Sequence, residues 1–111
     1  MDVIYNNFKL LQCTSSINLS SDTINCILVT PSYVPSVSAH SYYSDITGEA
    51  SGVGYTTSGV ALSAKTVTVS TSLSAAVFDA ADVTWTSSSV SANAAVLYKV
   101  TGSAATSPLI A

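Results

Sequence analysis

The chain lacks most of the side chains that carry chemistry in other proteins. It has no arginine, three lysines and one histidine in 111 residues. General acid–base catalysis usually draws on His, Asp, Glu or Lys within hydrogen-bond reach of one another. Phosphate groups are recognised by Arg and Lys, and nucleic-acid binders carry a basic patch that three scattered lysines cannot form. The composition therefore argues against an enzyme and against a nucleic-acid-binding protein.

Charge of either sign is scarce. Charged residues make up 8% of the chain, with a net charge of −3, against about 25% charged residues in a typical domain. No basic surface is available for an anionic membrane, and no segment approaches the roughly 18 apolar residues of a membrane-spanning helix. The first residues also lack the cationic and apolar parts of a secretory signal. We therefore expect a chain made and folded in a cytoplasm, with neither nucleic acid nor a membrane as its partner.

Cysteine is equally rare. Cys13 and Cys26 are the only two, and with one distant histidine they do not match the spacing of a zinc site. We expect no metal and no cofactor. The thiols are expected to be reduced side chains packed as small hydrophobic groups, with a disulfide within the chain or with a neighbour as the alternative. A reactive thiol is the least favoured hypothesis, because nothing basic lies nearby in the sequence to lower its pKa.

Hydroxyl side chains stand where charges would otherwise be. The chain holds 21 serines and 13 threonines, and its mean hydropathy is +0.46. A surface with so little charge is poorly protected against association. This composition indicates a structural protein that packs permanently against other proteins or against copies of itself.

Short strands separated by turns dominate the chain after residue 54. Residues 66–70, Thr-Val-Thr-Val-Ser, alternate in a way that predicts a strand with its valines inward and its hydroxyls outward. Further strands are predicted at residues 23–30, 55–57, 60–62, 75–79, 83–86, 94–100 and 107–111. Phe78 and Trp85 lie on two of them and are expected to share one core. This spacing predicts a single all-β domain over residues 1–111, an antiparallel β-sandwich or jelly roll.

Two segments depart from the strand pattern. Within residues 3–12, Ile4, Phe8 and Leu11 recur at helical spacing, which predicts a short helix or a tucked arm over residues 1–12. Residues 31–54 are irregular and rich in Pro, Gly and Tyr; such segments are often functional, and Tyr is favoured at protein interfaces. The candidate contact residues taken from both segments and their border are Tyr5, Phe8, Tyr33, His40, Tyr42, Tyr43 and Tyr55.

Three patterns superficially resemble chemical sites. His40 and Asp45 with a serine would suggest a hydrolytic triad, but no Gly-x-Ser-x-Gly elbow is present. The Gly-Val-Gly-Tyr sequence at 52–55 lacks the third glycine of a phosphate loop and predicts a bend. Asp79 and Asp82 predict turn capping, with a weak cation site as the alternative, because calcium needs six to eight oxygen ligands.

Several segments, taken in order and spacing, are similar to a known family. They are Tyr5-Asn6-Asn7-Phe8-Lys9, Asp22-Thr23-Ile24, Leu28-Val29-Thr30, Tyr43-Ser44-Asp45-Ile46-Thr47-Gly48-Glu49, Gly52-Val53-Gly54-Tyr55, Ala76-Val77-Phe78-Asp79, Asp82-Val83-Thr84-Trp85 and Ala95-Val96-Leu97-Tyr98-Lys99. Across nearly the whole chain they resemble small structural proteins of tailed bacteriophages. Members of that family often end in a Tyr-Ile-Asp-Phe-Gly-like sequence, which is missing here. We therefore expect that a neighbouring subunit covers the apolar C-terminal strand or that the natural chain continues past Ala111.

The resemblance implies a virion component and carries over no catalytic residue. We interpret the chain as a cement or decoration protein of the phage head, bound to the major capsid protein, to copies of itself or to both. A tail, fibre or adsorption module that binds host glycan or protein through Tyr42, Tyr43 or Trp85 is an alternative. A small hydrolase is a third hypothesis, disfavoured by the missing catalytic set.

Overall fold

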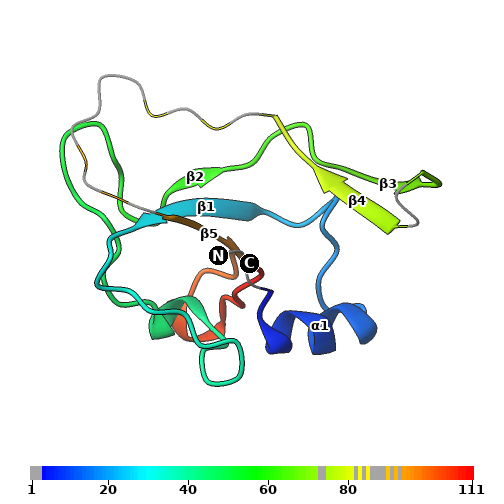
Figure 1. Cartoon of the computed structure of the whole chain (residues 1–111), viewed down its shortest axis with the longest axis horizontal. Coiled ribbons are helices and arrows are strands. Elements are labelled where there is room, and N and C mark those ends of the chain that lie inside the picture. Colours follow the sequence, from blue (N-terminus) through cyan, green and yellow to red (C-terminus); the bar gives the residue numbers. More distant parts are fainter. Residues whose placement is uncertain are drawn as a thin grey trace.

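A computed structural model shows a chain built mostly of strands in two antiparallel sheets, with one short helix. It describes residues 4–72, 75–81, 83, 85, 90, 92 and 94–111. The first sheet has the order β2-β1-β5 and the second is the pair β3-β4 (Figure 1). The elements in chain order are α1 (Asn6–Cys13), β1 (Ile24–Val29), the 3-10 helix η1 (Tyr43–Asp45), β2 (Val60–Ala61), β3 (Thr66–Ser70), β4 (Ala75–Asp79), β5 (Ala94–Lys99) and the 3-10 helix η2 (Ala104–Thr106). This confirms the predicted predominance of strands.

β1 is the central strand of the first sheet because its sequence, INCILV, is almost wholly apolar. β-Branched and apolar residues fit a pleated surface that is covered on both sides. All six of its residues pair with β5, from Ile24 opposite Lys99 to Val29 opposite Ala94. On its other edge, the turn that precedes β2 approaches closely at Gly59, where φ is +79° and a Cβ atom would collide with the Cys26 carbonyl. Only glycine fits there.

The C-terminal segment, residues 107–111, runs alongside the outer edge of β5. The Ile110 N–H donates to the Leu97 carbonyl (2.8 Å), and the Leu97 N–H donates to the Ala111 carbonyl (2.8 Å). Farther along, the Lys99 N–H donates to the Pro108 carbonyl (2.9 Å). The predicted strand at 107–111 is therefore extended and paired, although only isolated bridges mark it.

The same segment also hydrogen-bonds on its opposite side. The Leu109 N–H donates to the Ser41 carbonyl (2.9 Å), and the Ser107 carbonyl accepts from the Tyr43 N–H (2.8 Å). The Tyr5 N–H donates to the Ile110 carbonyl (3.1 Å). The expectation that a neighbouring subunit covers this strand is thus wrong, because the chain's own irregular region and N-terminal arm cover it.

The buried side chains form two clusters. Tyr5, Ile27, Val29, Tyr33, Val96, Tyr98 and Leu109 make the larger one, and Phe8, Ile17, Ile24 and Ile110 make the smaller one. α1 contributes Phe8 fully and Leu11 in part, whereas Ile4, predicted on the same face, is 52% exposed. Phe78 and Trp85, expected to share a core, are each only half-buried and belong to neither cluster.

The β3–β4 hairpin projects from the body of the molecule, at the right of Figure 1. Its valines are not inward, as the alternation predicted: Val67 is 49% exposed and Val69 is 80% exposed. The reason is that the second sheet has two strands and no apolar layer packs over Val69. The projection also fits a radius of gyration of 14.1 Å, slightly above the ~13 Å of a compact domain of this length.

Two further strand predictions fail. Residues 55–57 form no strand, since Tyr55 and Thr56 are irregular and Thr57 begins a turn. Of the predicted strand 83–86, Val83 and Trp85 lie outside any strand, and Thr84 and Thr86 lie outside the described residues.

Replacing Leu109 tests the importance of the C-terminal segment. Leu109 has no exposed surface, so Leu109→Ala should lower the free energy of unfolding by about 2–5 kcal/mol, as buried Leu→Ala truncations do. Leu10→Ala is the matched control, because Leu10 is 60% exposed on α1. Urea denaturation measures both, and equal, small effects would contradict the structure.

Candidate functional site

Residues 31–59 are held to the first sheet by a polar network centred on Glu49. The Glu49 carboxylate accepts hydrogen bonds from the Tyr43 hydroxyl, from the Tyr55 hydroxyl (2.6 Å) and from the Ser58 N–H (2.9 Å). The Tyr43 ring stacks on the Tyr98 ring of β5, with centroids 4.5 Å apart and planes at 14°. One half-buried carboxylate therefore fixes three segments of the irregular region against β5.

Two more contacts extend this network to β1. The Tyr98 hydroxyl donates to the Ser58 carbonyl (2.8 Å), which also accepts from the Asn25 side-chain amide (3.0 Å). The Tyr55 hydroxyl accepts from the Leu28 N–H (3.2 Å). Hydrogen bonds to a charged group in a half-buried site are stronger than ordinary ones, so this network makes the region rigid.

The phenols of this network are poor nucleophiles and poor bases. Burial, helped by the neighbouring Glu49 carboxylate, raises the pKa of Tyr43 to about 12. The same causes raise the pKa of Tyr55, and burial raises that of Tyr98. Each phenol therefore keeps its proton at neutral pH and acts as a hydrogen-bond donor.

A second cluster joins the N-terminal arm to the irregular region. The Tyr5 and Tyr33 hydroxyls lie 2.7 Å apart, and the Tyr33 hydroxyl lies 3.0 Å from His40 Nδ1. The Ser36 N–H donates to the same Nδ1 atom (3.3 Å). Because a backbone N–H can only donate, Nδ1 accepts, and the proton on Tyr33 points at His40. Tyr5 then donates to Tyr33, which gives the chain of hydrogen bonds one direction.

The structure divides the predicted contact residues into two groups. Tyr5, Phe8 and Tyr33 are buried in the chain's own clusters, with at most 7% of the residue exposed, so they offer little contact area to a partner. His40, Tyr42, Tyr43 and Tyr55 are half-buried. Tyr43 is part of the internal packing, because its ring stacks on Tyr98 and its hydroxyl donates to Glu49. Sequence reasoning missed Glu49, whose signal was that it is one of only two acids in the tyrosine-rich residues 31–59.

The described acidic residues of the patterns that resembled chemical sites accept hydrogen bonds from nearby backbone N–H groups. The Asp45 carboxylate accepts from the Ser41 N–H (2.8 Å) and the Tyr42 N–H (3.0 Å), and these two bonds lower its pKa. Asp79, at the end of β4, accepts from the Ala80 N–H (2.8 Å), while Asp82 lies outside the described residues. Among the residues with assigned positions, no group of three His, Cys, Asp or Glu side chains is arranged to hold a metal ion.

The bend predicted at 52–55 is confirmed. Gly54 has φ +82°, and the Tyr55 N–H donates to the Gly52 carbonyl (3.3 Å). The two cysteines are free thiols, Cys13 exposed at the end of α1 and Cys26 buried in β1. Burial raises the pKa of the Cys26 thiol, so it stays protonated and packs as a hydrophobic group.

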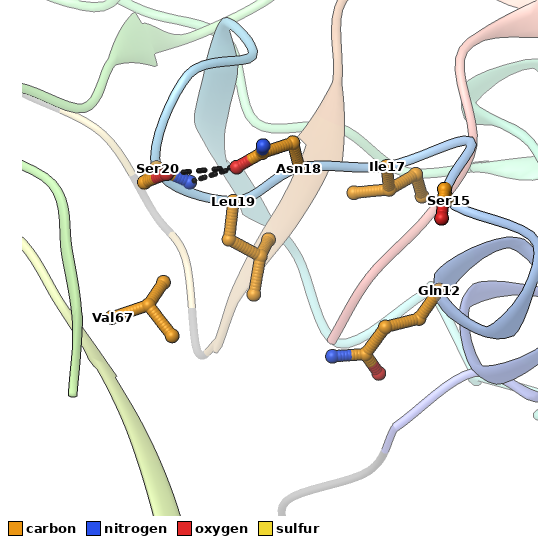
Figure 2. Close-up of a pocket in the computed structure, with 7 residues that line it drawn as sticks. All are labelled: Gln12, Ser15, Ile17, Asn18, Leu19, Ser20 and Val67. Carbon is orange, nitrogen blue, oxygen red and sulfur yellow. Dashed lines mark hydrogen bonds between the residues drawn. The ribbon is translucent and has the colours of Figure 1, made fainter. Parts of the chain in front are cut away.

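An open depression of about 340 Å³ lies between the end of α1 and β3. Figure 2 shows Gln12 and Leu19 reaching into it from one side and Val67 from the other. None of its lining side chains is charged. Two of its polar side chains bond each other, since Asn18 Oδ1 accepts from both the backbone and the hydroxyl of Ser20 (3.1 and 2.8 Å).

Comparisons with protein-family models, with curated proteins and with solved structures found no match to this chain. In the part of the chain with described coordinates, no helix is long and apolar enough to cross a membrane. Function has to be inferred from the molecule's own surface. That surface carries several large apolar side chains in the open, including Val34 (74% exposed) and Val53 (72% exposed) on the irregular region.

The titration of Tyr43 predicts a loss of stability at alkaline pH. Folding raises its pKa from the ordinary 10 to about 12, so between these values the folded state keeps a proton that the unfolded state has lost. The contribution is complete below about pH 10 and disappears as the pH rises through 12. Tyr43→Phe keeps the ring stacked on Tyr98 but removes the titrating hydroxyl. The free energy of unfolding should therefore fall less steeply above pH 10 in this variant; an identical pH dependence would exclude the proposed environment of Tyr43.

Glu49→Gln tests the centre of the network. The glutamine amide keeps the shape of the carboxylate but carries no charge. Its NH₂ group would also face a hydrogen-bond donor, because both carboxylate oxygens of Glu49 accept hydrogen bonds. We therefore expect the free energy of unfolding to fall by about 1–3 kcal/mol. Asp79→Asn is the control, because Asp79 makes only its local turn contact. Thermal denaturation at pH 7 measures both variants, and a Glu49→Gln protein as stable as the parent would show that the network adds nothing.

Proposed function

We propose that this protein is a structural component of a tailed-phage virion, a cement or decoration protein of the head whose partners are the major capsid protein and copies of itself. The observation that carries the proposal is the exposure of large apolar side chains on a surface with almost no charge. Val34, Val53 and Val69 are each more than 70% exposed, in a chain with only 8% charged residues. We take these exposed valines as candidate contacts with a protein partner.

Few charges remain to oppose association, because the described acids serve internal contacts. Asp22 binds Lys99 (3.2 Å) and accepts from the Asn18 N–H (2.8 Å). Glu49 is committed to its tyrosines and Asp45 to its backbone turn. Among the described residues that are exposed, only Lys9 and Asp79 are charged, so hydroxyl and apolar side chains dominate the outward-facing surface. Such a surface buries against another neutral protein surface at a low desolvation cost.

The irregular region is the part of the molecule best suited to contact a capsid. Val34 lies between Tyr33 and Pro35. The Tyr33 side chain is held in place by hydrogen bonds between its hydroxyl and the side chains of Tyr5 and His40. Because Glu49 holds the opposite end of the region, little conformational freedom is left to lose on docking, which favours binding. Half-exposed Tyr42 adds contact area with few rotatable bonds.

We further propose that the two sheets represent a reduced β-sandwich or jelly roll, as the strand spacing predicts. The two antiparallel sheets and the single short helix support this assignment. An experimental structure of the chain on its particle would test it, since a jelly roll requires the two sheets to stack face to face around one core.

Charged substitutions on the exposed valines test the proposed function. Val34→Asp with Val53→Asp should leave the fold intact, because both side chains point into solvent, but should weaken binding to empty phage heads by at least about tenfold through the cost of burying two unpaired charges. Ala105→Asp is the control, with the same type of charge at an exposed position outside residues 31–54. Co-sedimentation with heads that lack the protein gives the affinity.

Two outcomes would oppose the proposal. A parent protein that shows no affinity for heads would exclude a cement role, and binding to host cells instead would favour an adsorption module. Equal binding by the parent and the double variant would remove Val34 and Val53 from the contact surface. Circular dichroism melting of each variant shows whether the fold is preserved.

A further inference from the structure

β3 has an edge that is open over residues 66–69. The strand pairs with β4 through all five of its residues, and no other described strand pairs with it. In the first sheet β1 is central, the outer edge of β5 is covered by residues 107–111, and the other edge strand, β2, has only two residues. The β3 edge therefore presents backbone N–H and C=O groups that can pair with another strand.

This edge lacks the usual protection against pairing. Proteins protect exposed edge strands with charges, prolines or bulges. β3 reads Thr-Val-Thr-Val-Ser, with no charge and no proline, and its first four residues are exposed. The partner strand β4, by contrast, ends in Asp79. A new strand would thus meet less opposition at β3 than at β4.

We propose that β3 pairs with β3 of a second copy of this chain, antiparallel and about a two-fold axis at Thr68. In that register Val67 lies opposite Val69 of the second copy and Thr68 opposite Thr68, with Thr66 facing Ser70 at each end. Valines stand opposite valines on one face and hydroxyls opposite hydroxyls on the other. A slip of one residue would place each valine opposite a hydroxyl residue, and a slip of two would leave only three of the five strand residues paired, so this register gives the most matched pairs.

The charges beside the strand are compatible with this pair. Lys65 directly precedes β3, and Asp79 lies opposite Thr66 across the hairpin. The opposite charges of one copy therefore stand together at one end, where the second copy brings only its uncharged Ser70 and Thr71. No like charges face each other, and the two hairpins join into a sheet ordered β4-β3-β3-β4.

The small area sets the strength of the interaction. A strand of five residues on each side buries well under the ~1,200 Å² of a stable interface, so the pair is weak and forms only at high concentration. It becomes effective where many copies are held close together, since the second contact is then intramolecular. The self-pairing does not depend on the proposed function, because it needs no capsid.

Opposite charges at residue 68 test the pairing. T68K or T68E places two like charges across the two-fold axis and should weaken self-association by at least about tenfold. An equimolar mixture of T68K and T68E should associate again, because the introduced lysine of one copy then faces the introduced glutamate of the other. Sedimentation velocity over a concentration series up to about 1 mM, the range of such weak pairs, measures the mean mass of each sample.

Recovery in the mixture is specific to this geometry, because only a symmetric β3 pair brings residue 68 opposite itself. Ser51→Lys, Ser51→Glu and their mixture are the matched controls at an exposed site outside β3, and they should associate like the parent. A parent that stays monomeric throughout would overturn the proposal. So would association that is unaffected by the charge at 68, or a mixture that does not recover. Melting curves show that the variants are folded, and T68E provides the second variant if T68K is not.

Discussion

Hydrogen bonds along both sides of residues 107–111 connect parts of the molecule that lie far apart in the sequence. One side binds β5, and the other binds Ser41, Tyr43 and the backbone of Tyr5. Leu109 and Ile110 belong to the larger and the smaller buried cluster respectively. The N-terminal arm and the irregular region therefore have no complete packing surface until this last segment is in place. Such long-range pairings cost loop-closure entropy before they contribute stability, so the fold depends on contacts that form between the two ends of the chain.

A second constraint follows from the scarcity of charge. In a chain with six acidic residues, each acid in the described part has a partner in its own chain: Asp45 and Asp79 accept from nearby backbone N–H groups, Asp22 pairs with Lys99, and Glu49 accepts from two phenols. Removing water from these phenols raises their pKa values, which keeps them protonated as donors to the carboxylate. Glu49, one of these few charges, therefore both orders the irregular region and is itself half-buried.

The sequence predicted the elements whose pattern is local. β3 and β4 have the predicted bounds, β1, β2 and β5 are found within a residue of theirs, and α1 begins at Asn6 rather than at residue 3, since alternation and helical spacing depend on near neighbours. What it could not predict is which face is covered. Alternation in residues 66–70 shows that two faces differ, but the valines face outward because no layer packs over Val69. Tyr5 and Tyr33 were predicted to be contact residues for the same reason. The sequence does not show whether the hydroxyl of a loop tyrosine faces water or, as here, another buried hydroxyl. Glu49 escaped notice because its three donors come from positions 43, 55 and 58, which only the fold brings together.

The exposed edge of β3 also carries a risk of aggregation. A flat, apolar edge strand normally invites open-ended stacking. Here the strand is five residues long and belongs to a two-stranded ribbon, and such ribbons twist strongly, which limits extended stacking. Once two β3 strands are paired, the remaining outer edges belong to β4, where Asp79 places a negative charge at the end of each strand. A further copy would have to add to a charged edge. The unprotected edge therefore leads to a closed pair rather than to a fibre, because the protection missing from β3 is present on the strand next to it.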